Sequence, residues 1–81
     1  MRKRKSWPLF VTAETRSPDG RRVRMRRTVE ALGDAEAAML RAVRSRRDGG
    51  APFAGCEIVG TTLLGQVIRR TLNPDTLDFS K

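Results

Sequence analysis

A predicted tight turn over Ser17-Pro18-Asp19-Gly20 constrains the fold of this chain more than any other feature. Ser is common at the first position of a type I turn, Pro presets the backbone of the second, and Asp and Gly suit the positions that follow. A turn of this kind with a glycine bulge commonly joins two antiparallel strands. We therefore predict a β-hairpin with strands at about residues 8–16 and 21–30.

The hairpin register sorts the side chains by polarity, because successive residues of a strand point to opposite faces of a sheet. One face is apolar and the other is basic. Two residues break the pattern, since Arg27 falls on the apolar face and Phe10 falls on the basic face. Glu14 lies opposite Arg24, which is a favourable cross-strand pair. The predicted basic row consists of Arg22, Arg24 and Arg26.

Neighbours in this row would stand about 7 Å apart. This spacing resembles the distance between successive phosphates along a nucleic-acid strand, and an arginine can donate two hydrogen bonds to one phosphate or one guanine edge. An ordinary solvated strand face is the alternative interpretation.

A helix is expected after the hairpin, over about residues 34–48. Gly33 or Asp34 would cap it, and Gly49-Gly50 would end it. Apolar residues at spacings of three and four would pack on the apolar face of the hairpin. This stripe comprises Ala35, Ala38, Met39, Ala42 and Val43.

The last third of the chain predicts a short strand at residues 56–59 and a second helix at about 62–72. Leu63, Leu64, Val67, Ile68 and Leu72 follow helical spacing, whereas Gly65 weakens the helix and leaves a strand open. With a basic N-terminal tail over 1–6 and a C-terminal tail over 73–81, residues 7–72 are expected to form a single small α+β domain.

The positive charge of the chain is concentrated in its first third. Residues 1–27 contain ten Lys or Arg and two acidic residues, whereas residues 28–81 contain seven of each. Such an uneven distribution of charge produces a positive electrostatic potential at one part of the protein, which favours a polyanion or an acidic surface as the partner.

The composition argues against an enzyme. The chain has no His and no Tyr, so the usual residue for acid–base catalysis near neutral pH is missing. A single cysteine, Cys56, excludes an internal disulfide and a metal cluster, and we expect it to be a small buried residue rather than a reactive thiol. We expect no catalytic residue, no metal and no cofactor. A ribonuclease built on Arg and carboxylates is the open exception.

Near the basic start, the apolar run from Trp7 to Ala13 is too short for a signal peptide or a membrane span. We therefore expect a cytoplasmic protein with no membrane partner. Hydrophobic residues make up 38% of the 81 residues, which is low for a self-sufficient core and leaves a homo-oligomer open.

The order of these features resembles the small arm-type DNA-binding domain of phage and mobile-element tyrosine integrases, over residues 2–47. Trp7, Asp19-Gly20, the Arg21–Arg27 segment and the Ala35–Leu40 segment occupy the matching places. Those domains place a short sheet in the DNA major groove. The resemblance therefore implies that the basic row faces the groove and that the N-terminal tail contacts phosphates.

The chain departs from that family in its expected sheet. The third strand that usually precedes the helix is missing, or is reduced to a continuation of the second strand over Arg26 to Glu30. Without Tyr and His, recombinase chemistry is excluded.

The leading hypothesis is a small non-catalytic nucleic-acid-binding protein, an accessory or regulatory DNA binder of a phage or mobile element, with DNA favoured over RNA. The alternative is a protein-interaction module that docks its basic hairpin on an acidic protein or a ribonucleoprotein. Phe10 would stack on a base in the first case and anchor the protein partner in the second. The expected nucleic-acid-binding residues are Arg2, Lys3, Arg4, Lys5, Arg16, Arg21, Arg22, Arg24 and Arg26.

Overall fold

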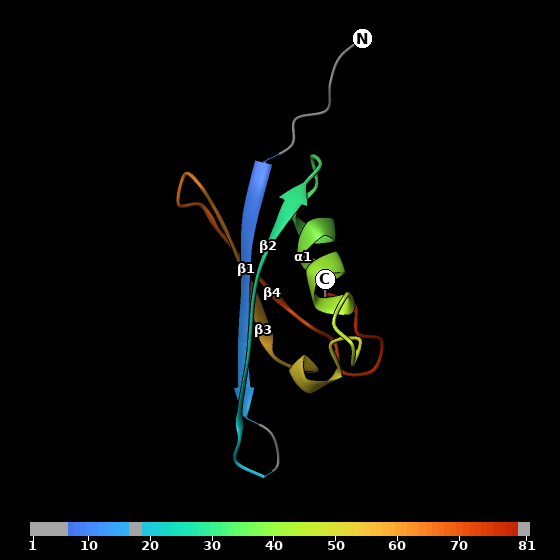
Figure 1. The fold of residues 1–81 in the computed structure, drawn as a ribbon. Coiled ribbons are helices and arrows are strands. Elements are labelled where there is room, and N and C mark those ends of the chain that lie inside the picture. Colours follow the sequence, from blue (N-terminus) through green and yellow to red (C-terminus); the bar gives the residue numbers. More distant parts are fainter. Residues whose placement is uncertain (1–6, 17–18, 80–81) are drawn as a thin grey trace.

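A four-stranded antiparallel sheet with one helix on one of its faces forms the molecule (Figure 1). The structure, a computed structural model, describes residues 7–16 and 19–79. The strand order is β2-β1-β3-β4, so the N-terminal hairpin and the C-terminal hairpin meet at β1 and β3. This α+β arrangement agrees in outline with the expected fold class. The elements are β1 (Trp7–Arg16), β2 (Arg22–Ala31), α1 (Ala35–Arg44), a 3-10 turn η1 (Ala51–Phe53), β3 (Glu57–Thr62) and β4 (Val67–Thr71).

The predicted hairpin and its register are confirmed. Cα partners run from Trp7 opposite Ala31 to Arg16 opposite Arg22. At the turn, the Arg21 backbone N–H donates to Asp19 Oδ1 at 3.2 Å, and Gly20 has a φ of 83°, which a glycine adopts without steric cost. Ser17 and Pro18, on which the turn prediction also relied, lie outside the described residues.

Helix α1 begins as expected but ends earlier than residue 48. The Asp34 side chain caps it by accepting a hydrogen bond from the Ala37 backbone N–H at 3.1 Å. At the other end, Ser45 is the C-cap and its backbone N–H donates to Arg41 O at 2.9 Å. In the described part of the chain, no helix is long and apolar enough to cross a membrane.

A compact ion-paired turn takes the place of the predicted last helical turn. Arg46 donates from Nε and Nη2 to the two carboxylate oxygens of Asp48, both at 3.1 Å, and its guanidinium carbon lies 4.9 Å from the centroid of the Phe53 ring. The Gly50 backbone N–H also donates to Asp48, at 3.0 Å. These bonds, the one from Arg46 above all, hold the pKa of Asp48 below its ordinary value.

The prediction of a second helix over residues 62–72 is wrong, because strand β4 occupies this region. Residues Val67–Thr71 pair with β3, from Thr61 opposite Val67 to Glu57 opposite Thr71. The predicted strand at 56–59 is confirmed in kind but runs as far as Thr62. Gly65, with a φ of 81°, lies in the turn between the two strands. The chain therefore reverses at this point and does not continue as the helix that the apolar spacing suggested.

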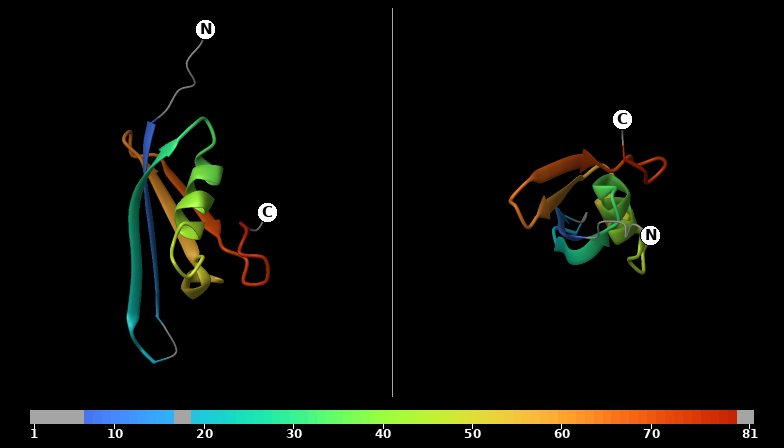
Figure 2. Two further views of the ribbon diagram at one scale, coloured as in Figure 1. Left: turned by 45° about the vertical axis from the view of Figure 1, so that its right-hand side comes forward. Right: turned by 90° about the horizontal axis from the view of Figure 1, so that it is seen from above.

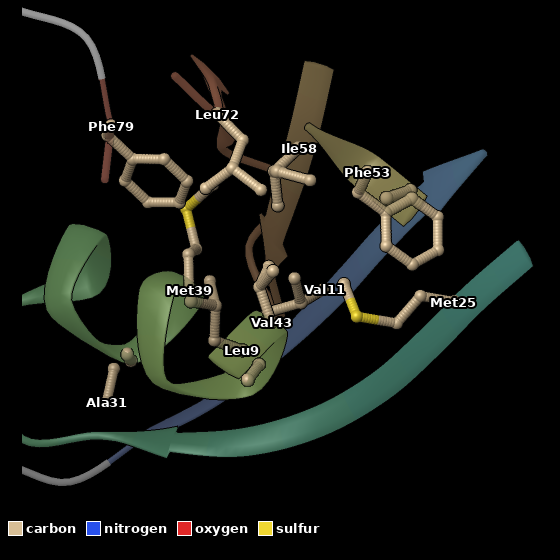
Figure 3. Packing of buried hydrophobic residues seen from close by; sticks show 13 residues of the cluster. Leu9, Val11, Met25, Ala31, Met39, Val43, Phe53, Ile58, Leu72 and Phe79 are labelled. Atoms are coloured by element: carbon tan, nitrogen blue, oxygen red, sulfur yellow. The ribbon is translucent and has the colours of Figure 1, made fainter. Parts of the chain in front are cut away.

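The core lies between the sheet and α1 (Figure 3). As predicted, the apolar stripe of the helix packs against the apolar face of the hairpin, and Met39 and Val43 are fully buried. C-terminal residues complete this core, since Leu72 forms a bridge with Phe79 and both are buried. The buried residues are Leu9, Val11, Ala13, Met25, Ala31, Ala38, Met39, Ala42, Val43, Phe53, Ile58, Leu72 and Phe79.

Candidate nucleic-acid interface

The face of the sheet opposite α1 carries the candidate interface. Of the elements in residues 7–16 and 19–79, none packs over this face, as both views of Figure 2 show. We call it the open face. Strand alternation assigns to it Pro8, Phe10, Thr12, Glu14 and Arg16 of β1, Arg22, Arg24, Arg26, Thr28 and Glu30 of β2, Glu57, Val59 and Thr61 of β3, and Val67, Arg69 and Thr71 of β4.

The predicted basic row lies on the open face. Arg22, Arg24 and Arg26 are all exposed and occupy alternate positions of β2, an edge strand of the sheet. Arg16 is also exposed and is the cross-strand partner of Arg22. Alternate placement along one strand brings these guanidinium groups to a common side, as the period-two pattern predicted.

Glu14 holds two arginines of this row at once. Its Oε1 lies 2.6 Å from Arg22 Nε, and its Oε2 lies 3.3 Å from Arg24 Nε. The Arg22 and Arg24 side chains remain 55% and 59% exposed. Since a guanidinium has five N–H donors, each arginine keeps most of its donors directed to solvent. Glu14 therefore orients the pair and leaves one positive charge in excess.

A second ion pair lies on the far side of the open face. Arg69 of β4 donates to Glu57 of β3 at 2.9 Å. Arg69 was not among the predicted site residues, because a helix was expected at this position. Alternate strand positions for Val67, Arg69 and Thr71 would have placed it on the basic face. Counted over the described residues, the open face has five arginines and three glutamates.

The remaining predicted residues occupy different places. Arg26 and Arg16 have no ion pair within the described part of the chain. Arg21 stands at the hairpin turn, with Nε 3.6 Å from the Asp19 carboxylate. Phe10 is 40% exposed and lies on the open face as predicted. The basic tail, Arg2, Lys3, Arg4 and Lys5, lies outside the described residues.

The single arginine on the apolar side of the hairpin is accommodated without burial. Arg27 is exposed, and its Nη1 donates to the hydroxyl of Ser45 at the end of α1, at 2.6 Å. Arg41 and Arg44, on the outer side of the helix, also bind locally: Arg41 donates to the Glu30 carbonyl at 2.8 Å, and Arg44 pairs with Asp78 at 2.6 Å. These arginines face away from the open face.

The part of the chain that the structure describes contains no group of three or more side chains able to hold a metal ion. Cys56 is a free thiol that is half-buried against the core, and not fully buried as expected. Comparison of the chain with protein-family models, with curated proteins and with solved structures finds no match.

Proposed function

We propose that this protein binds duplex DNA through the open face, without catalysis, as an accessory or regulatory factor. One observation carries the proposal: Arg22, Arg24 and Arg26 stand at alternate positions of an edge strand, on a face that no described element covers. Arginines in such a row can bind consecutive phosphates or fork onto guanine edges.

The shape of the sheet supports a groove-binding mode. Strand β3 pairs with β1 only from Leu9 to Ala13, whereas the β1–β2 pairing continues to Arg16 and Arg22. The end of the N-terminal hairpin is thus a two-stranded ribbon, which extends downward beyond the other strands in Figure 1. The major groove of B-DNA is wide enough for a two-stranded ribbon.

The charge distribution supports DNA as the partner. The chain has a net charge of +8, and a protein that neutralises several phosphates gains affinity by releasing condensed counterions. The resemblance to arm-type integrase domains points in the same direction, although in this chain the third and fourth strands follow the helix. Arg22, Arg24 and Arg26 would contact the groove, and Arg2 to Lys5, Arg16 and Arg21 would add phosphate contacts.

Fluorescence anisotropy with a labelled duplex over a salt series tests this proposal. If about six phosphates are engaged, log K should fall with log salt at a slope near −5. Replacing Arg22, Arg24 and Arg26 together with Ala should weaken binding more than about a hundredfold and reduce the slope to about −2 to −3, with an unchanged circular-dichroism spectrum.

A matched variant, in which Arg41, Arg44 and Arg47 of the helical side become Ala, removes the same net charge away from the open face. Its log K should fall with log salt at nearly the slope of the parent protein, reduced only slightly by the lower net charge. Equal losses for the two triple variants, or a parent slope near −1, would refute the proposal. A pull-down from nuclease-treated lysate tests the alternative: a protein partner retained through Phe10 and the basic row would identify a protein-interaction module instead.

A further inference from the structure

The turn between β3 and β4 presents two leucines to solvent. Leu63 is 68% exposed and Leu64 is 97% exposed. Turn positions are ordinarily taken by Gly, Asn, Asp, Ser and Pro, so two adjacent leucines here call for a physical reason. The turn lies on the side of the sheet away from α1 in both Figure 1 and Figure 2.

Backbone and side-chain hydrogen bonds hold this turn in one shape. The Gly65 N–H donates to Thr62 O at 3.0 Å, and the Thr62 N–H donates to Gln66 O at 3.0 Å. The Thr62 hydroxyl accepts a third bond, from the Gln66 N–H at 3.1 Å. The leucine side chains are thus presented by a closed turn rather than by a loose loop, and a group fixed before binding loses little entropy on contact.

Two further exposed apolar side chains, Phe10 and Val67, lie on the open face at the end of the sheet near this turn. Phe10 is the sheet partner of Thr61, and Thr61 is the partner of Val67. Phe10 and Val67 are 40% and 50% exposed. Phe10 lies opposite Thr28, six residues from Arg22, which corresponds to about 20 Å along the strand. The open face is therefore basic at the hairpin end and apolar at the end near the β3–β4 turn.

A second copy of the chain is a poor partner for this apolar end. The exposed parts of Phe10, Leu63, Leu64 and Val67 amount to roughly 400 Å², about half of what each partner of a stable dimer buries. The same face carries an excess of arginine, so two copies would also repel each other. A polyanion with apolar surface between its charges could contact the arginines at one end of the face and the apolar side chains at the other.

We propose that Leu63 and Leu64 form a wedge that inserts between adjacent base pairs of the duplex held by the arginine row. The inference rests on the proposed function. Leucine is among the side chains that proteins insert between base steps, and such insertion partly unstacks the step and bends the duplex by about 20–90°. The phosphates beside the inserted step would lie toward the basic end, where Arg26 and Arg69 stand at the same level of the sheet on its two edge strands.

The test compares a double variant, Leu63→Ser with Leu64→Ser, with the parent protein on a duplex of about 30 base pairs carrying a donor and an acceptor dye at its ends. The parent protein should increase energy transfer, because a bent duplex brings its ends together. It should also bind a duplex with a two-base mismatch about tenfold more tightly than a fully paired one, since the unstacking cost is already met. The double variant should lose both effects and change affinity for the paired duplex by less than about tenfold.

Leu32→Ser is the matched control. Leu32 is 50% exposed and follows β2, the edge strand that β1 separates from β3 and from the β3–β4 turn, so its replacement should leave bending and mismatch preference unchanged. Because Leu63 and Leu64 are exposed, the double variant keeps the parent melting temperature.

The possible results separate this inference from the proposed function. If the double variant binds and bends DNA as the parent does, the wedge is refuted and the DNA-binding proposal stands. If the parent binds no duplex, both are refuted. If the leucines instead control binding to vesicles of anionic phospholipid while bending is unaffected, the apolar end is a membrane contact and the wedge is refuted.

Discussion

Replacing Glu14 with Gln should strengthen DNA binding, although it removes two ion pairs from the protein. Glu14 lies between the guanidinium groups of Arg22 and Arg24, at 2.6 Å and 3.3 Å from their Nε atoms. Any phosphate bound by these arginines must approach a carboxylate of the same charge. Glutamine has nearly the same size and shape but no charge, so the exchange isolates the electrostatic effect.

The magnitude follows from the geometry. A phosphate on the outer edge of either guanidinium would lie about 6–7 Å from the Glu14 carboxylate, where two unit charges in water repel by about 0.6 kcal/mol. Two phosphates give about 1.2 kcal/mol, and screening at physiological salt reduces this to about half. We therefore expect Glu14→Gln to bind DNA about two- to eightfold more tightly, with the larger gain at low salt.

Anisotropy titrations at two salt concentrations measure this gain. Asp75→Asn is the control, because Asp75 is exposed in the C-terminal segment and its replacement changes the net charge by the same amount. The difference between the two variants reports the position of Glu14 rather than total charge. A thermal melt accompanies the titrations, since exposed ion pairs contribute at most about 1 kcal/mol, or a few degrees for a domain of this size.

Weaker binding by Glu14→Gln would refute the reasoning. It would mean that the arginines need the carboxylate for their orientation more than they suffer from its charge. Equal binding by the Gln and Asn variants would mean that no phosphate approaches this part of β2.

Two further predictions concern stability. Gly50→Ala should lower the free energy of unfolding, measured with urea, clearly more than Gly49→Ala does. Both glycines have positive φ, which costs an alanine about 1–2 kcal/mol. A Cβ at Gly50 would in addition collide with the Val43 side chain, whereas a Cβ at Gly49 would meet open space. Asp48→Asn should lower the melting temperature near neutral pH, and the difference from the parent should shrink as the pH falls below 3.8. A carboxylate whose folded-state pKa is lowered stabilises the fold above its unfolded pKa and loses this effect when it is protonated. A difference in melting temperature that persists unchanged at pH 2 would contradict this.

The N-terminal hairpin was predictable because its determinants are local. The turn residues and the period-two alternation both lie within a few positions of the bonds they specify, and the pairing of Glu14 with Arg24 followed from them. The helix start was predictable for the same reason, since Asp34 caps its own first turn. The end of the helix was not, because the bonds from Arg46 and Gly50 to Asp48 compete with further helical turns.

Strand β4 was kept only as the alternative to a helix, because its alternating pattern is hidden by one charged residue. On the side facing α1, the strand carries Ile68 and Arg70, and Leu72 follows just beyond its end, so the middle of these three alternate residues is basic. Arg70 is held there by Glu36 of the helix, with Nε 3.3 Å from its carboxylate. The sequence alone does not show that Glu36 will pair with Arg70. It shows only apolar residues at helical spacing, which favours a helix over the strand that forms.

The amino-acid sequence by itself determined a basic row with alternate positions on one strand and an apolar stripe on one helix, because both depend on the repeat of a single element. Only the tertiary structure decided what lies beside that row. The arrival of Arg69 on the same face, and the position of the turn with Leu63 and Leu64 beside Phe10, both depend on the pairing of β3 with β1, which joins segments far apart in the chain. Such contacts depend on which strands pair, and strands pair through backbone N–H and C=O groups that nearly every residue carries, so the residue pattern alone does not specify the partner strand.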